Sequence, residues 1–142
     1  MANTFGTQMT KIQNTVPPER AEVGDVGGRV RVFNEKVTLA AQASGDTITV
    51  GLLPAGARVL YGIIYSTVTF GATATIAISK AGATGKYRAA AVFTAVDTPT
   101  LFGITADAGE KLTAAETVIV TIAAAALPGS GTFRVMLFYT LD

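Results

Sequence analysis

Short apolar runs separated by turn residues fill the chain from residue 29 onward. Within most runs apolar and polar side chains alternate, as along Thr73–Ser79 and Thr132–Leu141, which is typical of strands that bury one face. Glycine and proline in segments such as Pro54–Gly56 and Pro128–Gly131 supply the backbone angles that turns need. The pattern predicts about eight strands, over Arg29–Ala40, Thr47–Leu52, Ala57–Thr67, Thr73–Ser79, Lys86–Thr94, Leu101–Thr105, Glu116–Ala124 and Thr132–Leu141.

The first predicted strand changes phase along its length. Val30 and Val32 are expected to point inward, followed by Val37 and Leu39 on the opposite parity. Because side chains alternate strictly along a strand, this change predicts a bulge near residues 33–34. The third strand is apolar on both faces, so we expect it to be central or covered by a partner.

An internal similarity bears on the fold. Residues 47–61 and 117–139 both contain a β-branched run, a Leu-Pro turn and a strand with Arg-Val. Two similar hairpins would suit an eight-stranded jelly roll, although hairpins also converge on such turns without any repeat. The predicted fold class is all-β: a single antiparallel β-sandwich, as an eight-stranded jelly roll over residues 29–142, preceded by an extended N-terminal arm.

Residues 1–28, here called the N-terminal arm, are polar and show no sustained strand or helix period. The segment could be a frayed terminus or an arm that docks on neighbouring subunits. For docking, the candidate contact residues are the spaced apolar side chains, the prolines and two arginines where the arm meets the body: Phe5, Met9, Ile12, Val16, Pro17, Pro18, Arg29 and Arg31. Arginine is enriched at interfaces, where it can bind carboxylates in a bidentate manner.

Composition strengthens the expectation of assembly. Only 15% of the residues are charged, against about 25% in an average soluble protein, and a surface poor in charge often has a partner covering part of it. The net charge of +1 comes from interleaved basic and acidic residues, which argues against a nucleic-acid partner. No signal peptide is expected at the start, and Val59–Ser79 and Thr117–Phe133 read as strand pairs rather than membrane spans.

Candidate chemistry is scarce because the chain contains no histidine and no cysteine. Ser-His-Asp triads, Cys-His pairs and metal sites built on these side chains are therefore excluded, and we predict no catalytic residue, metal or cofactor. Asp107 and Glu110 could bind a hard cation, but they lack the alternating acid spacing of a calcium loop. The acidic run Glu19, Glu22 and Asp25 is interpreted as solvated or as salt partners for a neighbour.

Two further patterns have structural interpretations. The segment Ala83–Lys86 is faintly similar to a phosphate-binding loop, but Lys80 stands where the first glycine belongs and Tyr87 replaces the Ser/Thr. A glycine-rich hairpin tip is the favoured reading. The tyrosines could form a sugar-binding platform, but they fall in strand centres, which favours core or interface packing; they are Tyr61, Tyr65, Tyr87 and Tyr139.

Several short segments of the chain resemble small structural proteins of tailed bacteriophages. They are Met1–Gly6, Thr38–Gln42, Leu53–Arg58, Gly85–Ala90 and Arg134–Tyr139. The resemblance is one of texture over most of the chain. It implies a virion protein, made in the cytoplasm of the host bacterium, that decorates and cements the outer capsid surface. It further implies a homotrimer, with the major capsid protein as partner and the arm reaching across capsomers.

Two other functions stay open at the level of sequence. The chain could be a head–tail or tail adaptor or a fibre-base protein, which would place it at a single vertex or on the tail. It could also be a carbohydrate-binding module that attaches particles to cell surfaces, which would require exposed aromatic residues on loops. An enzyme is the least favoured class, because the carboxylates show no paired arrangement.

Overall fold

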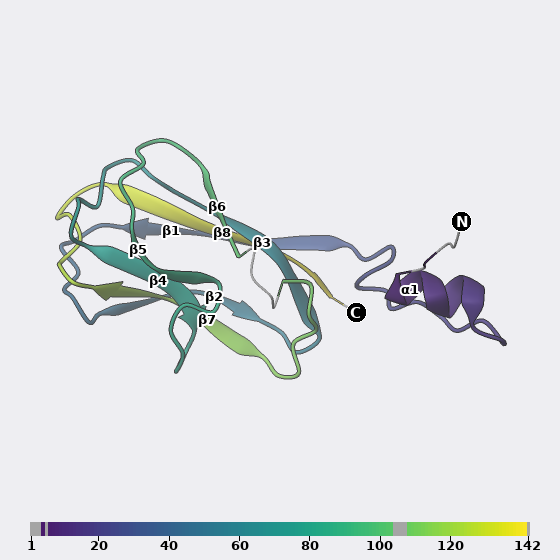
Figure 1. Ribbon diagram of the computed structural model, residues 1–142. Coiled ribbons are helices and arrows are strands. Elements are labelled where there is room, and N and C mark those ends of the chain that lie inside the picture. Colours follow the sequence, from purple (N-terminus) through teal and green to yellow (C-terminus); the bar gives the residue numbers. More distant parts are fainter. Residues whose placement is uncertain (1–3, 5, 104–107, 142) are drawn as a thin grey trace.

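The computed structural model describes residues 4, 6–103 and 108–141, and its arrangement is shown in Figure 1. Two short helical turns near the start, α1 and η1, precede eight strands. The bounds are α1 (Thr7–Met9), η1 (Thr10–Asn14), β1 (Val30–Thr38), β2 (Thr47–Leu53), β3 (Ala57–Ser66), β4 (Thr75–Lys80), β5 (Arg88–Val92), β6 (Thr100–Phe102), β7 (Glu116–Ala123) and β8 (Thr132–Leu141).

The strands form two four-stranded antiparallel sheets that pack face to face. The first sheet has the order β1-β8-β3-β6 and the second has the order β2-β7-β4-β5. The strands pair as in one long hairpin, with the first strand beside the last: β1 pairs with β8, β2 with β7, β3 with β6, and β4 with β5. Such a hairpin rolled into two packed sheets is the jelly-roll topology. The structure therefore confirms the predicted all-β fold, the sandwich and the eight-stranded jelly roll.

The core lies between the two sheets, as the alternation in β7 and β8 predicts. Along β8, Phe133, Val135 and Leu137 are fully buried, and the intervening side chains point outward. The facing strand β7 contributes alternate residues in the same way, so the two inner faces interdigitate. The largest buried apolar side chains are Phe133, Leu53, Ile64, Ile76, Ile78, Ile122, Leu137, Val118, Val120 and Val135.

The prediction for the first strand is wrong in two respects. β1 pairs with β8 without any register shift from Val30 to Thr38, so there is no bulge near residues 33–34. Val30 and Val32 point away from the core and are 55% and 50% exposed. Phe33 and Val37 pack inward, and side chains alternate regularly between the two faces along the whole of β1. Because β1 is a terminal strand, polar side chains on its inward parity can reach water past the sheet edge.

Irregular pairing occurs in other strands instead. The register of β2 with β7 shifts between Thr49 and Gly51, and that of β3 with β8 shifts between Val59 and Tyr61. β3 lies between β8 and β6, so its predicted central position is confirmed. The two Leu-Pro turns are not hairpin turns, because β2 and β3 lie in different sheets, as do β7 and β8. Each turn is a corner that carries the chain from one sheet to the other.

The fifth strand is shorter than predicted. It spans Arg88–Val92, whereas the alternation predicts Lys86–Thr94 with Tyr87, Ala89, Ala91 and Phe93 on one face. Of these four side chains, Tyr87 and Phe93 are buried and Ala89 and Ala91 are exposed. The buried aromatics lie just outside the strand, at its two ends, so they anchor this edge of the second sheet. The pairing of β5 with β4 is also irregular, with a shift between Ile76 and Ile78.

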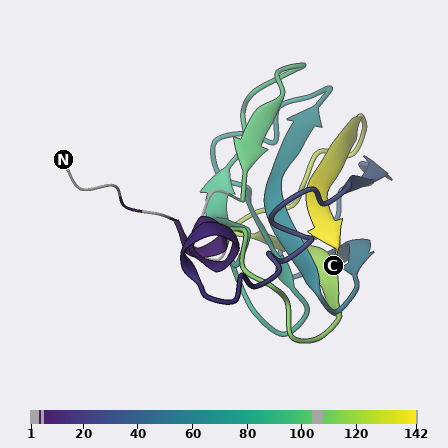
Figure 2. The same ribbon diagram turned by 90° about the vertical axis from the view of Figure 1, so that its right-hand side faces the viewer.

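The N-terminal arm contains helical residues that the sequence pattern did not predict. α1 and η1 form a continuous helical stretch, which ends before a cis peptide bond between Val16 and Pro17. Figure 1 shows this stretch at one end of the sandwich, beyond the strands, and Figure 2 views the molecule from that end. Neither helical segment of the described chain has the length and apolar content needed to cross a membrane.

Candidate assembly surfaces

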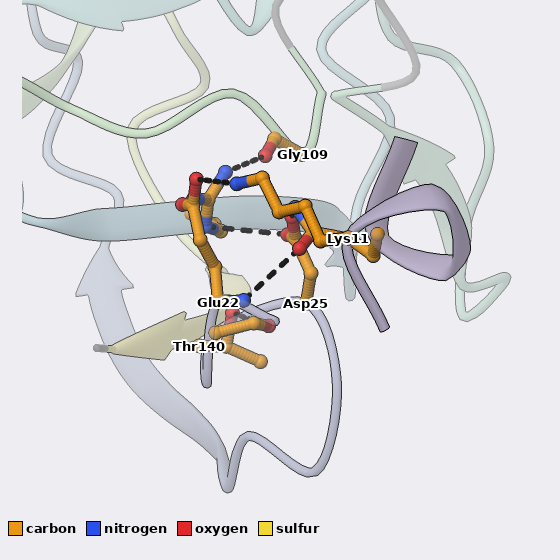
Figure 3. Close-up of polar contacts among 8 residues, drawn as sticks. Lys11, Glu22, Asp25, Gly109 and Thr140 are labelled. Atoms are coloured by element: carbon orange, nitrogen blue, oxygen red, sulfur yellow. Dashed lines mark hydrogen bonds and ion pairs between the residues drawn. The ribbon is translucent and has the colours of Figure 1, made fainter. Parts of the chain in front are cut away.

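A buried arginine ties the N-terminal arm to the body. Arg58 projects from β3 and is only 6% exposed. Its guanidinium binds the carboxylate of Glu22, lies 3.2 Å from Asp25 (Nε to Oδ1), and donates to the carbonyl of Gly109 at 3.1 Å (Nη1 to O). Figure 3 shows Glu22 and Asp25 of the arm gathered with Lys11 and Gly109 around this cluster of contacts, which are drawn as dashed lines. Two anions close to one desolvated cation compensate the cost of burying its charge.

The same carboxylates fold the arm onto itself. Lys11 in η1 lies 3.2 Å from Glu22 (Nζ to Oε1), and Gln8 in α1 donates to Asp25 at 2.7 Å (Nε2 to Oδ2). The side chain of Gln8 also accepts the backbone N–H of Glu22 at 3.0 Å. We call Lys11, Glu22, Asp25 and Arg58 the Arg58 latch. Through it, one cluster of polar groups holds both the helical stretch and residues 22–25 against the sheet.

A cleft of about 480 Å³ opens beside the Arg58 latch, between α1 and the loop at Gly109 and Glu110. Three acidic residues line it, and two of them, Glu22 and Asp25, are already paired with Arg58. Among the residues that the structure describes, no group of three or more acidic, histidine or cysteine side chains is placed to hold a metal ion. Asp107, which the sequence suggested as a cation ligand with Glu110, lies outside the described residues.

The contact residues predicted from the sequence are solvent-facing in the single chain. Met9, Ile12 and Val16 are exposed, and Val16 is 94% exposed. Pro17, Pro18, Arg29 and Arg31 are also exposed, and Phe5 lies outside the described residues. The structure does not bring the arm residues together with the two arginines, and their role in contacts between subunits stays a prediction. The acidic residues Glu22 and Asp25 pair with Arg58 of the same chain.

The outer side of the first sheet forms an apolar surface that the sequence pattern did not predict. Cross-strand neighbours place Val32 beside Phe138 and Phe138 beside Tyr61, and the last two rings stack with centroids 4.8 Å apart. The next row joins Met136 to Ile63. We call this surface the outer apolar face; its members are Val30, Val32, Tyr61, Ile63, Leu101, Met136 and Phe138.

The two ends of the outer apolar face differ in character. At one end the arm borders it, since Thr140 of β8 donates to the carbonyl of Gly24 at 2.8 Å, next to the Arg58 latch. At the other end it is basic, because Lys36 lies opposite Arg134 across β1 and β8. A contiguous apolar surface of this kind, framed by polar groups, is typical of a protein interaction site.

Glu116 is the centre of a second polar cluster. Lys86 lies 2.6 Å from Glu116 (Nζ to Oε1), and the Tyr87 hydroxyl donates to the same carboxylate at 2.6 Å. Burial works to raise the pKa of Glu116, but the hydrogen bonds from Lys86 and Tyr87 and the charges of Lys86 and Lys80 outweigh it and lower that pKa below its ordinary value. Lys86, the lysine of the phosphate-loop-like segment, is therefore occupied in a structural ion pair.

No family model and no curated protein sequence matches this chain. Solved structures do share its fold. A chain of the cyanophage Pam1 capsid asymmetric unit is 24% identical, with a TM-score of 0.68 over 81% of this chain and 86% of that chain. A chain of the Ralstonia phage GP4 capsid is also 24% identical, with a TM-score of 0.65 over the same shares.

A third similar structure is a chain of the acidic stable capsid structure of Helicobacter pylori bacteriophage KHP30. It is 14% identical, with a TM-score of 0.60 over 79% of this chain and 87% of that chain. At these identities the likeness concerns the fold. The jelly roll described above is thus one that chains in phage capsid structures also adopt, over nearly their whole length.

Proposed function

We propose that this chain is a non-enzymatic structural protein of a bacteriophage virion that binds the outer surface of the capsid as a decoration or cement protein. The observation that carries the proposal is the shared fold: three chains from phage capsid structures match most of this chain and most of their own length. The absence of histidine and cysteine from the sequence also supports a structural rather than a catalytic role.

The outer apolar face supplies the surface for assembly in this proposal. Val30, Val32 and Leu101 are each at least half exposed to water in the single chain, and covering apolar area stabilises a complex by roughly 25 cal/mol per Å² before the cost of association. We assign this face to contacts among copies of the chain about a threefold axis, giving a homotrimer.

The arm makes the contact with the major capsid protein in this proposal. Met9, Ile12 and Val16 are exposed apolar side chains of the arm, whose helical stretch lies at one end of the sandwich (Figure 1). Each contact would be small, but a trimer presents three arms, and many trimers on one shell add the gain of multivalent binding. The protein would be made in the host cytoplasm and would act on the virion, where it stabilises the shell against the pressure of packaged genome.

The experiment is a binding measurement on phage heads purified without this protein. Full-length protein is added, the heads are sedimented, and the number of bound copies per head is measured. Val32→Asp, on the outer apolar face, is expected to lose most of the binding. Val96→Asp is the matched control, because Val96 is 44% exposed, close to the 50% of Val32, but lies outside that face.

Val16→Asp tests the arm in the same measurement, because its side chain is 94% exposed and has no part in folding the body. The proposal expects reduced binding to heads with an unchanged oligomeric state. Saturable binding by the wild type supports the proposal. If wild-type protein does not bind heads, or if Val32→Asp and Val96→Asp bind equally, the proposal is rejected.

A further inference from the structure

Three of the four sheet edges carry features that discourage pairing with another chain. In the first sheet, the terminal strand β6 has only three residues and follows Pro99. In the second sheet, β2 is interrupted by its register shift, and β5 has its own irregular pairing. The guanidinium of Arg88 also donates hydrogen bonds to two backbone carbonyls of β5, those of Ala91 and Val92, both at 3.2 Å. These two acceptors are therefore already used within the chain. Short, bulged or blocked edges are the usual protection against edge-to-edge association.

The fourth edge, that of β1, lacks these features. β1 is nine residues long, contains no proline, and pairs with β8 in unbroken register from end to end. It is the terminal strand of its sheet, and all but two of its residues, Phe33 and Val37, are exposed. A long, straight and exposed edge presents a row of backbone donors and acceptors that an added strand can bind.

We propose that β1 pairs antiparallel with β1 of a second copy of this chain, about a twofold axis that passes through Phe33. The charges of the strand carry the choice of partner and of register. When Phe33 faces Phe33 of the other copy, Arg31 of each copy lies opposite Glu35 of the other. Opposite charges at directly facing positions stabilise a pair of strands, whereas like charges destabilise it.

Val30–Thr38 contains three charged residues, Arg31, Glu35 and Lys36. Among the registers centred on a residue of this strand, only the one centred on Phe33 places two of them, Arg31 and Glu35, opposite a residue of the opposite sign within the strand. A register centred on Arg31 sets two arginines against each other, and one centred on Glu35 sets two glutamates against each other. The spacing of four residues between Arg31 and Glu35 thus makes the strand complementary to itself in one alignment. Both residues are exposed and accessible to a partner.

The pairing also covers apolar surface on the outer side of the sheet. Val32 would lie opposite Asn34 of the other copy, and Val30 opposite the aliphatic stem of Lys36. Since Val30 and Val32 are 55% and 50% exposed in the single chain, the added strand shields both. The result is one continuous sheet in which the outer apolar faces of two copies lie edge to edge, so that the proposed threefold contact uses the faces themselves and the twofold contact uses the edge of β1. The inference concerns two copies of this chain alone, so it does not depend on the proposed capsid role.

Sedimentation equilibrium of the full-length protein over a range of concentrations tests the pairing. The wild type is expected to associate in pairs through this edge, as dimers or, where the threefold contact of the proposed homotrimer also forms, as pairs of trimers. Arg31→Glu and Glu35→Arg should each weaken association by about tenfold or more, because each replaces two attractive pairs by repulsive ones. The double variant Arg31→Glu/Glu35→Arg restores both pairs and should return association to within about threefold of the wild type.

Lys36→Glu is the matched control, since it changes the net charge by the same amount as Arg31→Glu but faces no charge in the proposed register. It should associate like the wild type. The inference is overturned if the wild type shows no twofold association at any concentration. It is also overturned if the double variant does not recover, or if Lys36→Glu is as damaging as Arg31→Glu.

Cross-linking tests the register by an independent route. The chain has no native cysteine, so Val32→Cys and Asn34→Cys proteins each carry a single thiol on the exposed outer side of β1. Facing residues of antiparallel strands have Cα atoms about 4.5–5.5 Å apart, within the range of a disulfide. Mixing the two proteins under mild oxidation should give mainly the mixed disulfide dimer. If the mixed dimer is no more abundant than random pairing of the two proteins would give, the register is contradicted. This result would stand on its own, because head binding by the same protein tests the proposed function separately.

Discussion

Replacing Arg58 with leucine should release the N-terminal arm while leaving the jelly roll folded. In the wild type this side chain binds Glu22 and Asp25 of the arm and is 6% exposed. Hydrogen bonds to charged groups contribute about 1.5–3 kcal/mol each. The carboxylates are 37% and 29% exposed, so water screens the contacts and one such contribution is a reasonable total for the Arg58 latch. A loss of about 1.5–3 kcal/mol raises the undocked fraction of the arm by roughly 10- to 150-fold.

Limited trypsin digestion reads out this fraction, because Arg20 lies within the arm and is cleaved when the arm undocks. Cleavage tracks the open population when opening and closing are fast compared with proteolysis. Arg134→Leu is the control, since Arg134 lies on the same sheet and binds Asn34 rather than the arm. Equal cleavage rates at Arg20 in wild type and Arg58→Leu would refute the latch. So would an equal acceleration by Arg134→Leu, because the effect would then not come from the arm contact.

Two further predictions concern the body. Gly62→Ala should destabilise the protein by about 1–3 kcal/mol in urea unfolding, because the added Cβ would overlap the ring of Phe102 across β3 and β6. Gly129→Ala is the control and should be close to neutral, because the nearest atom to its added Cβ would be 3.9 Å away. Equal losses of stability in the two variants would contradict this packing. For Glu116, the folded-state pKa is lowered from 4.5, so its carboxylate stabilises the fold above that pH and loses this contribution as the pH falls through the folded value. Below about pH 4.5 the free energy of unfolding should therefore fall less steeply with decreasing pH in Glu116→Gln than in the wild type. The same pH dependence in both proteins would count against the ion pair.

The sequence pattern predicts the fold class because the central strands of a sandwich alternate strongly. In β8 the buried Phe133, Val135 and Leu137 stand at every second position, so the inward face is evident from residue types alone. β1 is misleading for a physical reason. In a terminal strand, polar residues such as Arg31 can occupy positions on the inward side of the sheet, and valines can occupy exposed positions on the outward side. The change of phase in the sequence is therefore a mark of the exposed surface, not of a bulge.

The Arg58 latch could not be predicted from the sequence, because its members are separated by 36 residues between Glu22 and Arg58. The acidic run in the arm is the available signal, but its pattern is compatible with a solvated segment or with salt partners for a neighbour, whereas Glu22 and Asp25 pair with Arg58 of the same chain. Glu22 and Arg58 meet only because the fold places β3 beside the arm. The exposure of Met9, Ile12 and Val16 agrees with their prediction as contacts but does not test it.

The central claim is that this protein coats the shell of a phage, and imaging of the particles tests it most directly. Electron cryomicroscopy of virions from cells that produce this protein would locate its density. The account predicts a jelly roll of this topology repeated over the whole outer surface of the head, with the N-terminal arm in contact with the shell beneath it. Density for the protein confined to the tail or to a single vertex, or its absence from the particle, would contradict the account.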